Sequence, residues 1–355
     1  MAIQLDSSVR PEERFASGRT PGSSSRRNKY QAARLIIRRV IGAFFSLCAV
    51  VVFNFFLFRV VSGDPARSAA RNRHLSAEGV AHLREQWGLD KSRWEQFTTY
   101  VGHLLHGDLG TTFIGSQPVS SVIRDAFWPT ILLVGTSTLL STIIGTWIGI
   151  KGAWQRGSTF DRVSNGTSLT LYAMPVFWLG IVLLMLFAGN QVGLGIFPTG
   201  GIADANVDTS SPAGWVNVLQ HLFLPCLTLT LAYLAQYSLI MRSSMLDEMG
   251  QEYLTTARAK GLRDAVVRQR HVVPNALLPA FTLIFLNFGF VISGAVTVEY
   301  VFSWHGLGWL TQDAVSALDY NLLQGLFLVF SASVIFFNLI ADLSLGLLDP
   351  RVREV

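Results

Sequence analysis

The chain has 355 residues, of which 50% are hydrophobic and only 14% are charged, and its mean hydropathy is +0.39. Soluble domains carry about a quarter charged residues, so the composition excludes an ordinary soluble protein and favours an integral membrane protein. A net charge of +5 is compatible with nucleic-acid binding. The basic residues, however, gather at the ends of apolar segments, where membrane topology places them. We therefore expect no nucleic-acid partner.

The N-terminal residues 1–34 are predicted to form a disordered cytoplasmic tail, because they are rich in Ser, Gly, Arg and Pro and their first 30 residues show no apolar periodicity. The string SSSRRNKY also resembles a twin-arginine export signal. The apolar run that follows is longer than a signal's core of about 7 to 15 residues, so we favour a retained membrane span.

Apolar segments of about 20 residues, the length that crosses a bilayer, can be placed six times. The predicted fold class is therefore all-α, a polytopic membrane protein with six transmembrane helices. Cys48 and Cys226 fall in or beside these segments and indicate buried small side chains, with no disulfide framework. The six predicted spans cover residues 40–61, 131–150, 163–188, 221–241, 279–298 and 322–343.

The distribution of basic residues predicts the orientation. Lys and Arg gather in the N-terminal tail, in residues 151–162, after Met241 and at the C-terminus, whereas residues 190–220 and 299–321 contain none. By the positive-inside rule, both termini and the central loop are cytoplasmic in a multi-pass protein of the cell membrane. The segment 62–128 contains several Arg residues but is too long to count strongly in that rule.

Segment 62–128 is predicted to form an extracytoplasmic cap of short amphipathic helices, either a landing surface for a substrate-binding protein or a structural lid. His103 and His106 could share one helix face as metal ligands. No nearby Cys, Glu or third His completes a ligand set, so we expect no metal site. In the third span, Pro175 is predicted to kink the helix, because proline removes one backbone hydrogen bond.

The interval 247–279 is polar and basic and lies between two long apolar runs. Its acidic start, Arg258 and Lys260 near the end, and a following Gly261 predict one short helix. A second helix is predicted over about 264–271, with Pro274 preventing its simple continuation. Two short helices joined at a glycine suit docking into a partner's groove. The alternative is a solvated basic loop without a partner.

Within this interval, YLTTARAKGLRDAVVRQRHVVPN resembles the cytoplasmic EAA loop of ABC importer permeases, and ARAKGL resembles the form found in the dipeptide and oligopeptide branch. Thr255, Thr256 and Ala257 stand where the general consensus has Glu-Ala-Ala. The resemblance extends to SGDPA, HGDLGTTF, FSWHGLG and NLIADLSLGLLDPRVR, although His305 stands where the branch usually has Pro. It covers about residues 35–353.

This resemblance implies a type I ABC importer permease fold over residues 35–355, with 62–128 as the cap and 242–278 as a cytoplasmic coupling loop. It implies a second homologous permease, two ATP-binding subunits, an extracytoplasmic substrate-binding protein and surrounding lipid. The expected cargo is a di- or oligopeptide, with a nickel chelate or glutathione as alternatives. The chain itself contains no G-x-x-x-x-G-K-[ST] phosphate loop and no set of a nucleophile with its base. We therefore expect no enzymatic activity and no bound cofactor, with ATP and Mg on partner subunits.

Two sets of site residues follow. Asp342 and Glu299 are the candidate intramembrane polar residues, since acidic side chains in spans are functional candidates by default. A proton-coupled secondary transporter would need a relay of such groups, and only Asp342 lies inside a predicted span. The residues expected to couple to the ATPase are Tyr253, Ala257, Arg258, Lys260, Gly261 and Leu262.

Overall fold

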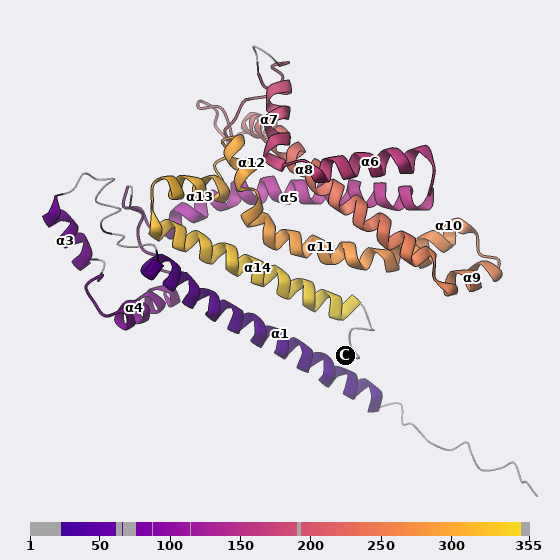
Figure 1. The fold of residues 1–355 in the computed structure, drawn as a ribbon, viewed down its shortest axis with the longest axis horizontal. Coiled ribbons are helices and arrows are strands. Elements are labelled where there is room, and N and C mark those ends of the chain that lie inside the picture. The colour runs from indigo at the N-terminus through magenta and orange to yellow at the C-terminus, as the bar shows by residue number, and fades with distance from the viewer. Residues whose placement is uncertain are drawn as a thin grey trace, which may run out of the picture.

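The computed structural model describes residues 23–61, 66, 76–86, 88–113, 115–189 and 193–348. These residues form helices and connecting turns (Figure 1), and within these ranges the only β-type pairing is an isolated bridge between Thr111 and Pro118. The predicted all-α fold class is confirmed.

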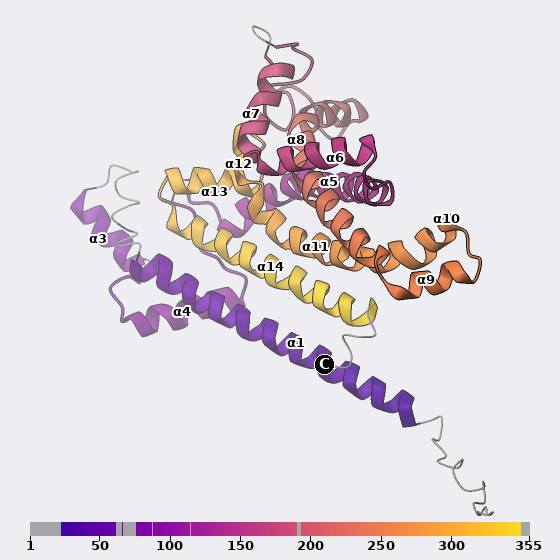
Figure 2. The same ribbon diagram turned by 45° about the vertical axis from the view of Figure 1, so that its right-hand side comes forward.

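Five long helices form the body of the molecule, and in both views the last of them runs alongside the first (Figures 1 and 2). Four stretches within the described residues are long and apolar enough to cross a membrane, namely Ile36–Arg59, Val119–Trp154, Pro212–Met249 and Tyr320–Ser344. The fifth predicted span, 279–298, falls on α11 (Val273–Gly294), whose side chains at 282 and 285–294 lie outside the described part of the chain. The long helices are α1 (Ser23–Phe56, extended by the π-helical turn η1, Leu57–Val61), α5 (Val119–Trp154), α8 (Pro212–Met249), α11 (Val273–Gly294) and α14 (Tyr320–Leu348).

The remaining predicted span is broken in two. Helices α6 (Thr159–Ala173) and α7 (Val176–Phe187) meet at 104° and together qualify as a fifth, bent span. Met174 is extended, with φ −78° and ψ 134°, as the residue before a proline prefers. The expected kink at Pro175 is therefore a complete break between two helices.

Helices α5 and α8 pack closely along their length. A side chain at Gly149 would place its Cβ 2.7 Å from the Met241 Cβ and 2.7 Å from the carbonyl oxygen of Ser238. Only glycine fits this contact, as is common where membrane helices approach closely. This packing fixes the end of α8 relative to the end of α5, which matters for the hairpin that follows α8.

Short helices lie at the two ends of the long ones. Here the end that carries α3, α4, α12 and α13 is called the cap end, and the end that carries α9 and α10 is called the hairpin end (Figures 1 and 2). The short helices are α3 (Ala77–Gln86), α4 (Arg93–Leu105), α12 (Val296–Val301), α13 (Leu307–Ser316), α9 (Glu252–Ala259) and α10 (Asp264–Val267).

Several predicted boundaries differ from the structure. α1 begins at Ser23, inside the predicted tail, and the Arg, Lys, Gln and Ala residues that follow are good helix formers; residues 1–22 lie outside the described part of the chain. The expected cap, 62–128, ends at Pro118, since α5 starts at Val119. Of the SGDPA motif, only Ala66 is among the described residues.

The expected stop at Pro274 does not occur. After α10, the chain continues through a π-helical turn, η2 (Arg268–Val272), directly into α11, and Pro274 occupies the first turn of α11. The π-helical turn immediately before α11 accommodates this proline, which has no N–H to donate to the preceding turn. The second helix of the loop is therefore continuous with the following long helix.

Candidate functional site

Residues 251–272 form a compact helical hairpin at the hairpin end, here called the 251–272 hairpin. Its turn depends on Gly261, which has φ +80°, a conformation that glycine adopts without steric cost. The Gly261 N–H donates to the Arg258 carbonyl oxygen at 2.9 Å, which ends α9. A Cβ at this position would meet no atom within 4 Å, so the glycine is needed for its backbone conformation and not for space.

An ion pair closes the hairpin across its turn. Arg258 Nε lies 3.2 Å from Asp264 Oδ1, joining the end of α9 to the start of α10. Both side chains are exposed, and such pairs contribute only about 0.2 to 1 kcal/mol. The pair therefore orients the two short helices more than it stabilises them.

The inner face of the hairpin packs on the ends of the long helices. Leu254 and Ala257 are 1% and 8% exposed, and they are three residues apart on the same face of α9. They lie in one apolar cluster with residues of α5, α8 and α11, here called the base cluster: Ala153, Met241, Met245, Leu254, Ala257, Val267, Val272, Ala276 and Ala280. Ala257, expected at a docking surface, thus supports the hairpin from beneath.

The outer face presents the other expected residues to solvent. Tyr253 and Leu262 are each 38% exposed, and Arg258, Lys260 and Gly261 are exposed as well. The structure thus gathers all six expected coupling residues in one hairpin, five of them on its surface. The surface thus carries two exposed apolar side chains, Tyr253 at the start of α9 and Leu262 at the turn, together with the basic Arg258 and Lys260. Protein interfaces combine apolar contacts with polar ones in this way.

Tyr253 is held by polar contacts on both sides of the hairpin. Its hydroxyl donates to Glu248 Oε2 at 2.7 Å and accepts from Asn275 Nδ2 at 3.0 Å. The His271 carbonyl oxygen also lies 3.1 Å from that hydroxyl. The Tyr253 hydroxyl therefore links the hairpin to the last turn of α8 and to the first turn of α11.

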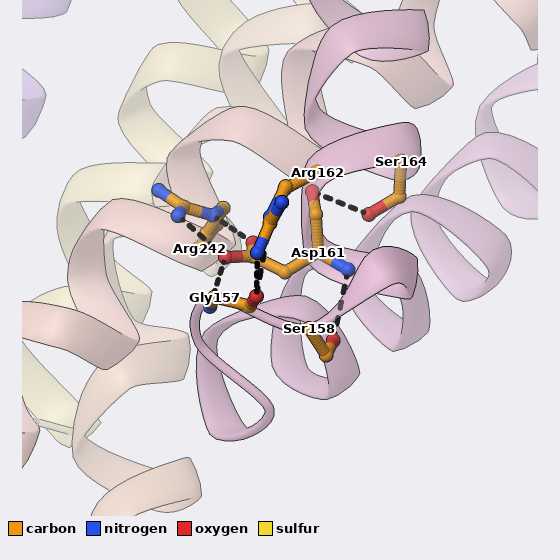
Figure 3. Close-up of polar contacts among 6 residues, drawn as sticks. All are labelled: Gly157, Ser158, Asp161, Arg162, Ser164 and Arg242. Carbon is orange, nitrogen blue, oxygen red and sulfur yellow. Dashed lines mark hydrogen bonds and ion pairs between the residues drawn. The ribbon is translucent and has the colours of Figure 1, made fainter.

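A buried ion pair fixes the neighbouring turn between α5 and α6 to α8 (Figure 3). Arg242 Nε lies 2.7 Å from Asp161 Oδ1, and Arg242 Nη2 lies 3.1 Å from Asp161 Oδ2. The Asp161 side chain is 5% exposed and that of Arg242 is 24% exposed. Two parallel charge-assisted bonds of this kind fix orientation as well as distance.

The backbone of the turn also hydrogen-bonds to the Asp161 carboxylate. The Gly157 N–H donates to Asp161 Oδ2 at 2.9 Å, and Ser158 Oγ accepts from the Asp161 N–H at 3.2 Å as the N-cap of α6 (Figure 3). At the end of α5 next to this turn, the Arg268 guanidinium lies over the Trp154 ring, 5.5 Å from its centroid. The α5–α6 turn is thereby joined to α8, and the end of α5 is joined to η2, the last part of the hairpin.

Sequence reasoning missed this ion pair. Its members are 81 positions apart, so no local pattern joins them. The available signal was Ser158 three residues before Asp161, which is typical of a helix N-terminus. That signal identifies the cap but not its arginine partner.

The two candidate intramembrane carboxylates are far apart in the fold. Asp342 lies near the end of α14, with Oδ1 3.9 Å from Arg39 Nη1, and its side chain is 57% exposed.

Glu299 lies in α12 at the cap end and is fully buried. Its carboxylate accepts from Thr130 Oγ1 at 2.7 Å, from the Gly308 N–H at 2.8 Å and from the Trp309 N–H at 3.1 Å. Glu299 thus stabilises the N-terminus of α13.

The histidine pair of the cap has partners within the chain. His103 Nδ1 lies 2.8 Å from Asp108 Oδ2, and His106 Nδ1 lies 2.8 Å from the Gly102 carbonyl oxygen. Asp108 also accepts from the Gly110 N–H, and this bond and His103 lower the pKa of its carboxyl group. No three His, Cys, Asp or Glu side chains within the described ranges are grouped so that they could hold a metal ion.

Comparison with known proteins identifies the family of this chain. Residues 141–354 match the family described as binding-protein-dependent transport system inner membrane component, and residues 32–134 match the N-terminal region of such membrane components. The chain belongs to this family. As a permease of the dipeptide and oligopeptide branch of ABC importers, it is a multi-pass inner-membrane transport component, and the family works together with ATPase and substrate-binding partners.

Several relatives of this permease match it almost end to end. The glutathione transport system permease protein GsiC of Salmonella typhi is 36% identical over 318 residues, which cover 90% of this chain and 98% of the relative. The dipeptide transport system permease protein DppB of Escherichia coli K12 is 34% identical over 338 residues, covering 90% and 99%. GsiC of Pectobacterium atrosepticum is 36% identical over 317 residues, covering 89% and 98%.

Proposed function

We propose that this permease forms half of the translocation pathway of an ATP-driven importer for di- or oligopeptides. The observation that carries the proposal is the 251–272 hairpin, which exposes apolar and basic side chains and packs on the base cluster. The nearly complete match to permeases named for dipeptide and glutathione transport supports the choice of cargo. The chain contributes no phosphate-binding loop of its own, so partner subunits supply ATP hydrolysis with bound ATP and Mg.

The hairpin is proposed to seat on an ATP-binding subunit. Tyr253, Leu262, Arg258 and Lys260 would make the contact, and Gly261 would hold the turn. Ala257 is assigned to the base cluster because it is 8% exposed. Movement of the ATPase would pass through Tyr253 to α8 and α11, while the Asp161–Arg242 pair would keep the α5–α6 turn moving with α8.

The complete assembly is proposed to contain a second homologous permease, two ATP-binding subunits and an extracytoplasmic substrate-binding protein. Both termini and the hairpin would face the cytoplasm, because basic residues gather there and are absent from residues 190–220 and 299–321. The cap end would then face outward, where α3 and α4 could meet the binding protein.

The experiment that tests this proposal is purification of the tagged, detergent-solubilised chain from its native membrane, followed by identification of the subunits that accompany it. We expect a second permease and nucleotide-binding subunits, and their loss when Leu262 is replaced by Asp. Recovery of the chain alone from membranes that retain peptide uptake would contradict the proposal.

Glutathione is the second candidate cargo, because the relatives named for glutathione transport match this chain at 36% identity and the dipeptide permease at 34%. Uptake of a labelled dipeptide and uptake of labelled glutathione, each measured with an excess of the other compound unlabelled, separates the two. Uptake of the dipeptide that glutathione does not reduce favours peptide cargo, and uptake of glutathione that the dipeptide does not reduce favours the second candidate.

A further inference from the structure

A cavity of about 450 Å³ opens at the cap end, between the end of α1, helix α4, the loop before α5 and the start of α14. This volume lies within the range of about 300 to 1,000 Å³ that is typical of small-molecule sites. Its walls are held by the chain's own contacts: Asn321 Nδ2 donates to the Thr111 carbonyl oxygen at 3.0 Å, and Gln96 Nε2 donates to the Lys91 carbonyl oxygen at 2.9 Å.

Three buried polar side chains converge beside this cavity. The Tyr100 hydroxyl, Gln324 Nε2 and Asn54 Oδ1 interact with one another, but among the described residues none of them makes a hydrogen bond of good geometry. Tyr100 and Gln324 line the cavity, and Asn54 lies next to Gln324, since its Nδ2 donates to the Gln324 carbonyl oxygen at 3.0 Å. Buried polar atoms in native proteins are nearly always well hydrogen-bonded, so a polar group that enters the cavity can complete the hydrogen bonding of these three side chains.

The charges in the walls indicate the chemistry of that group. Arg59 and Lys91 contribute positive charge, and Glu85 and Asp108 contribute negative charge. Arg59 is the last residue of the apolar stretch of α1, and within the described ranges no carboxylate lies within ion-pair distance of its side chain. A guanidinium fork beside a phenol O–H and an amide N–H offers donors suited to a carboxylate.

Polar side chains and glycines make up nearly all of the lining, and Leu109 is the single aliphatic side chain among its described residues. A lipid would need an apolar path for its acyl chains, whereas a small water-soluble zwitterion needs only polar walls of both signs. The cavity is therefore better matched to a soluble solute with one carboxylate and one ammonium group.

We propose that this cavity binds a small zwitterionic peptide, with its carboxylate on Arg59 and its ammonium group toward Glu85 and Asp108. The choice of a peptide rests on the proposed function, whereas the carboxylate site rests on the cavity itself. The site would hold cargo at the cap end of the permease, ahead of the membrane-spanning part of the pathway.

The test is isothermal titration calorimetry of the dipeptide Ala-Ala with the purified full-length chain in lipid nanodiscs. We expect saturable binding, weakened about tenfold or more in Arg59→Gln, because a charge-assisted pair is lost. Arg59→Lys should recover part of the affinity, and Tyr100→Phe should weaken binding a few-fold. The matched control is Arg124→Gln, which removes an exposed positive charge outside the cavity lining.

Ala-Ala amide, which lacks the carboxylate, should not bind. The proposal is overturned if Ala-Ala does not bind, if the amide binds equally well, or if Arg59→Gln leaves the affinity unchanged. Binding of glycerophosphoethanolamine in place of Ala-Ala would assign the cavity to a lipid headgroup and also overturn the peptide assignment.

ATP-driven dipeptide uptake by the complete transporter separates failure of this inference from failure of the proposed function. If the complete transporter takes up the dipeptide but binding does not depend on Arg59, only the assignment of the cavity is wrong. If binding depends on Arg59 but the transporter shows no ATP-driven uptake, the proposed function is wrong, and the cavity is still a carboxylate site.

Discussion

Arg242 of α8 and Asp161 of α6 form a two-point ion pair, with N–O distances of 2.7 and 3.1 Å, at the end of the molecule that carries the 251–272 hairpin. The pair joins a turn between two helices to the helix that leads into the hairpin. Because the Asp161 side chain is only 5% exposed, loss of either partner leaves the other charge poorly solvated.

Replacing Asp161 by Asn is expected to destabilise the protein and to reduce coupled uptake. Removing one partner of a buried pair costs about 3 to 5 kcal/mol, and we expect the lower end because Arg242 is 24% exposed. Thermal unfolding in detergent measures the loss, with the exposed Asp125→Asn as control. In a double-mutant cycle, Asp161→Asn with Arg242→Gln should cost clearly less than the sum of the single changes. Additive costs would show that the two side chains do not act as a pair.

Replacing Gly261 by Leu is expected to weaken association with the ATPase and to reduce uptake. The position has φ +80°, which costs a residue with a side chain about 1 to 2 kcal/mol, while the space around it is open. Gly261→Asn should retain more function, because asparagine tolerates this conformation.

The matched control for Gly261 is Gly250→Leu, since Gly250 has φ −82° and requires no left-handed backbone. If the Gly250 and Gly261 variants lose ATPase association and uptake equally, the left-handed conformation of Gly261 is not the cause of the loss.

Leu262 and Leu254 distinguish the outer face of the hairpin from its base. Leu262→Ala should change the free energy of unfolding by no more than about 0.5 kcal/mol, because this side chain is 38% exposed. The same change should reduce co-purification of the ATPase. Leu254→Ala should lower stability by about 2 to 5 kcal/mol, since Leu254 is 1% exposed. If Leu262→Ala retains full association with the ATPase, this surface is not the docking site.

Gly149 is expected to tolerate no side chain. Gly149→Val would force α5 away from α8, because a Cβ there would lie 2.7 Å from Met241 and Ser238 atoms. Overpacking typically costs about 1 to 3 kcal/mol, measured as loss of folded protein in detergent. Gly135→Val is the control in the same helix, since a Cβ there would meet nothing within 4 Å. This control should lose much less folded protein than Gly149→Val.

Local patterns predicted much of this fold. Span lengths and apolar composition predicted an all-α membrane protein, and the geometry of proline predicted a kink at Pro175, where the structure has a complete break. Gly261 was predicted to end α9, and its φ of +80° confirms that reading. Each of these predictions depends on a property of one residue or one short segment.

Features that depend on tertiary contacts or on helix register were not predicted. The Asp161–Arg242 pair joins residues 81 positions apart, and Pro274 is accommodated by a preceding π-helical turn instead of ending a helix. Ala257 was grouped with exposed residues, although its spacing of three from Leu254 places both on one face of a helix. Applying that periodicity to α9 would have placed Ala257 in the base cluster.

ATP-driven uptake of a labelled dipeptide into proteoliposomes tests the central claim most directly. The proteoliposomes would contain this permease, the co-purified second permease and ATP-binding subunits, with the binding protein supplied on the cap side. The account predicts uptake that requires ATP on the hairpin side and is lost in Leu262→Asp. Uptake by this chain alone, driven by a proton gradient and unaffected by ATP, would contradict it.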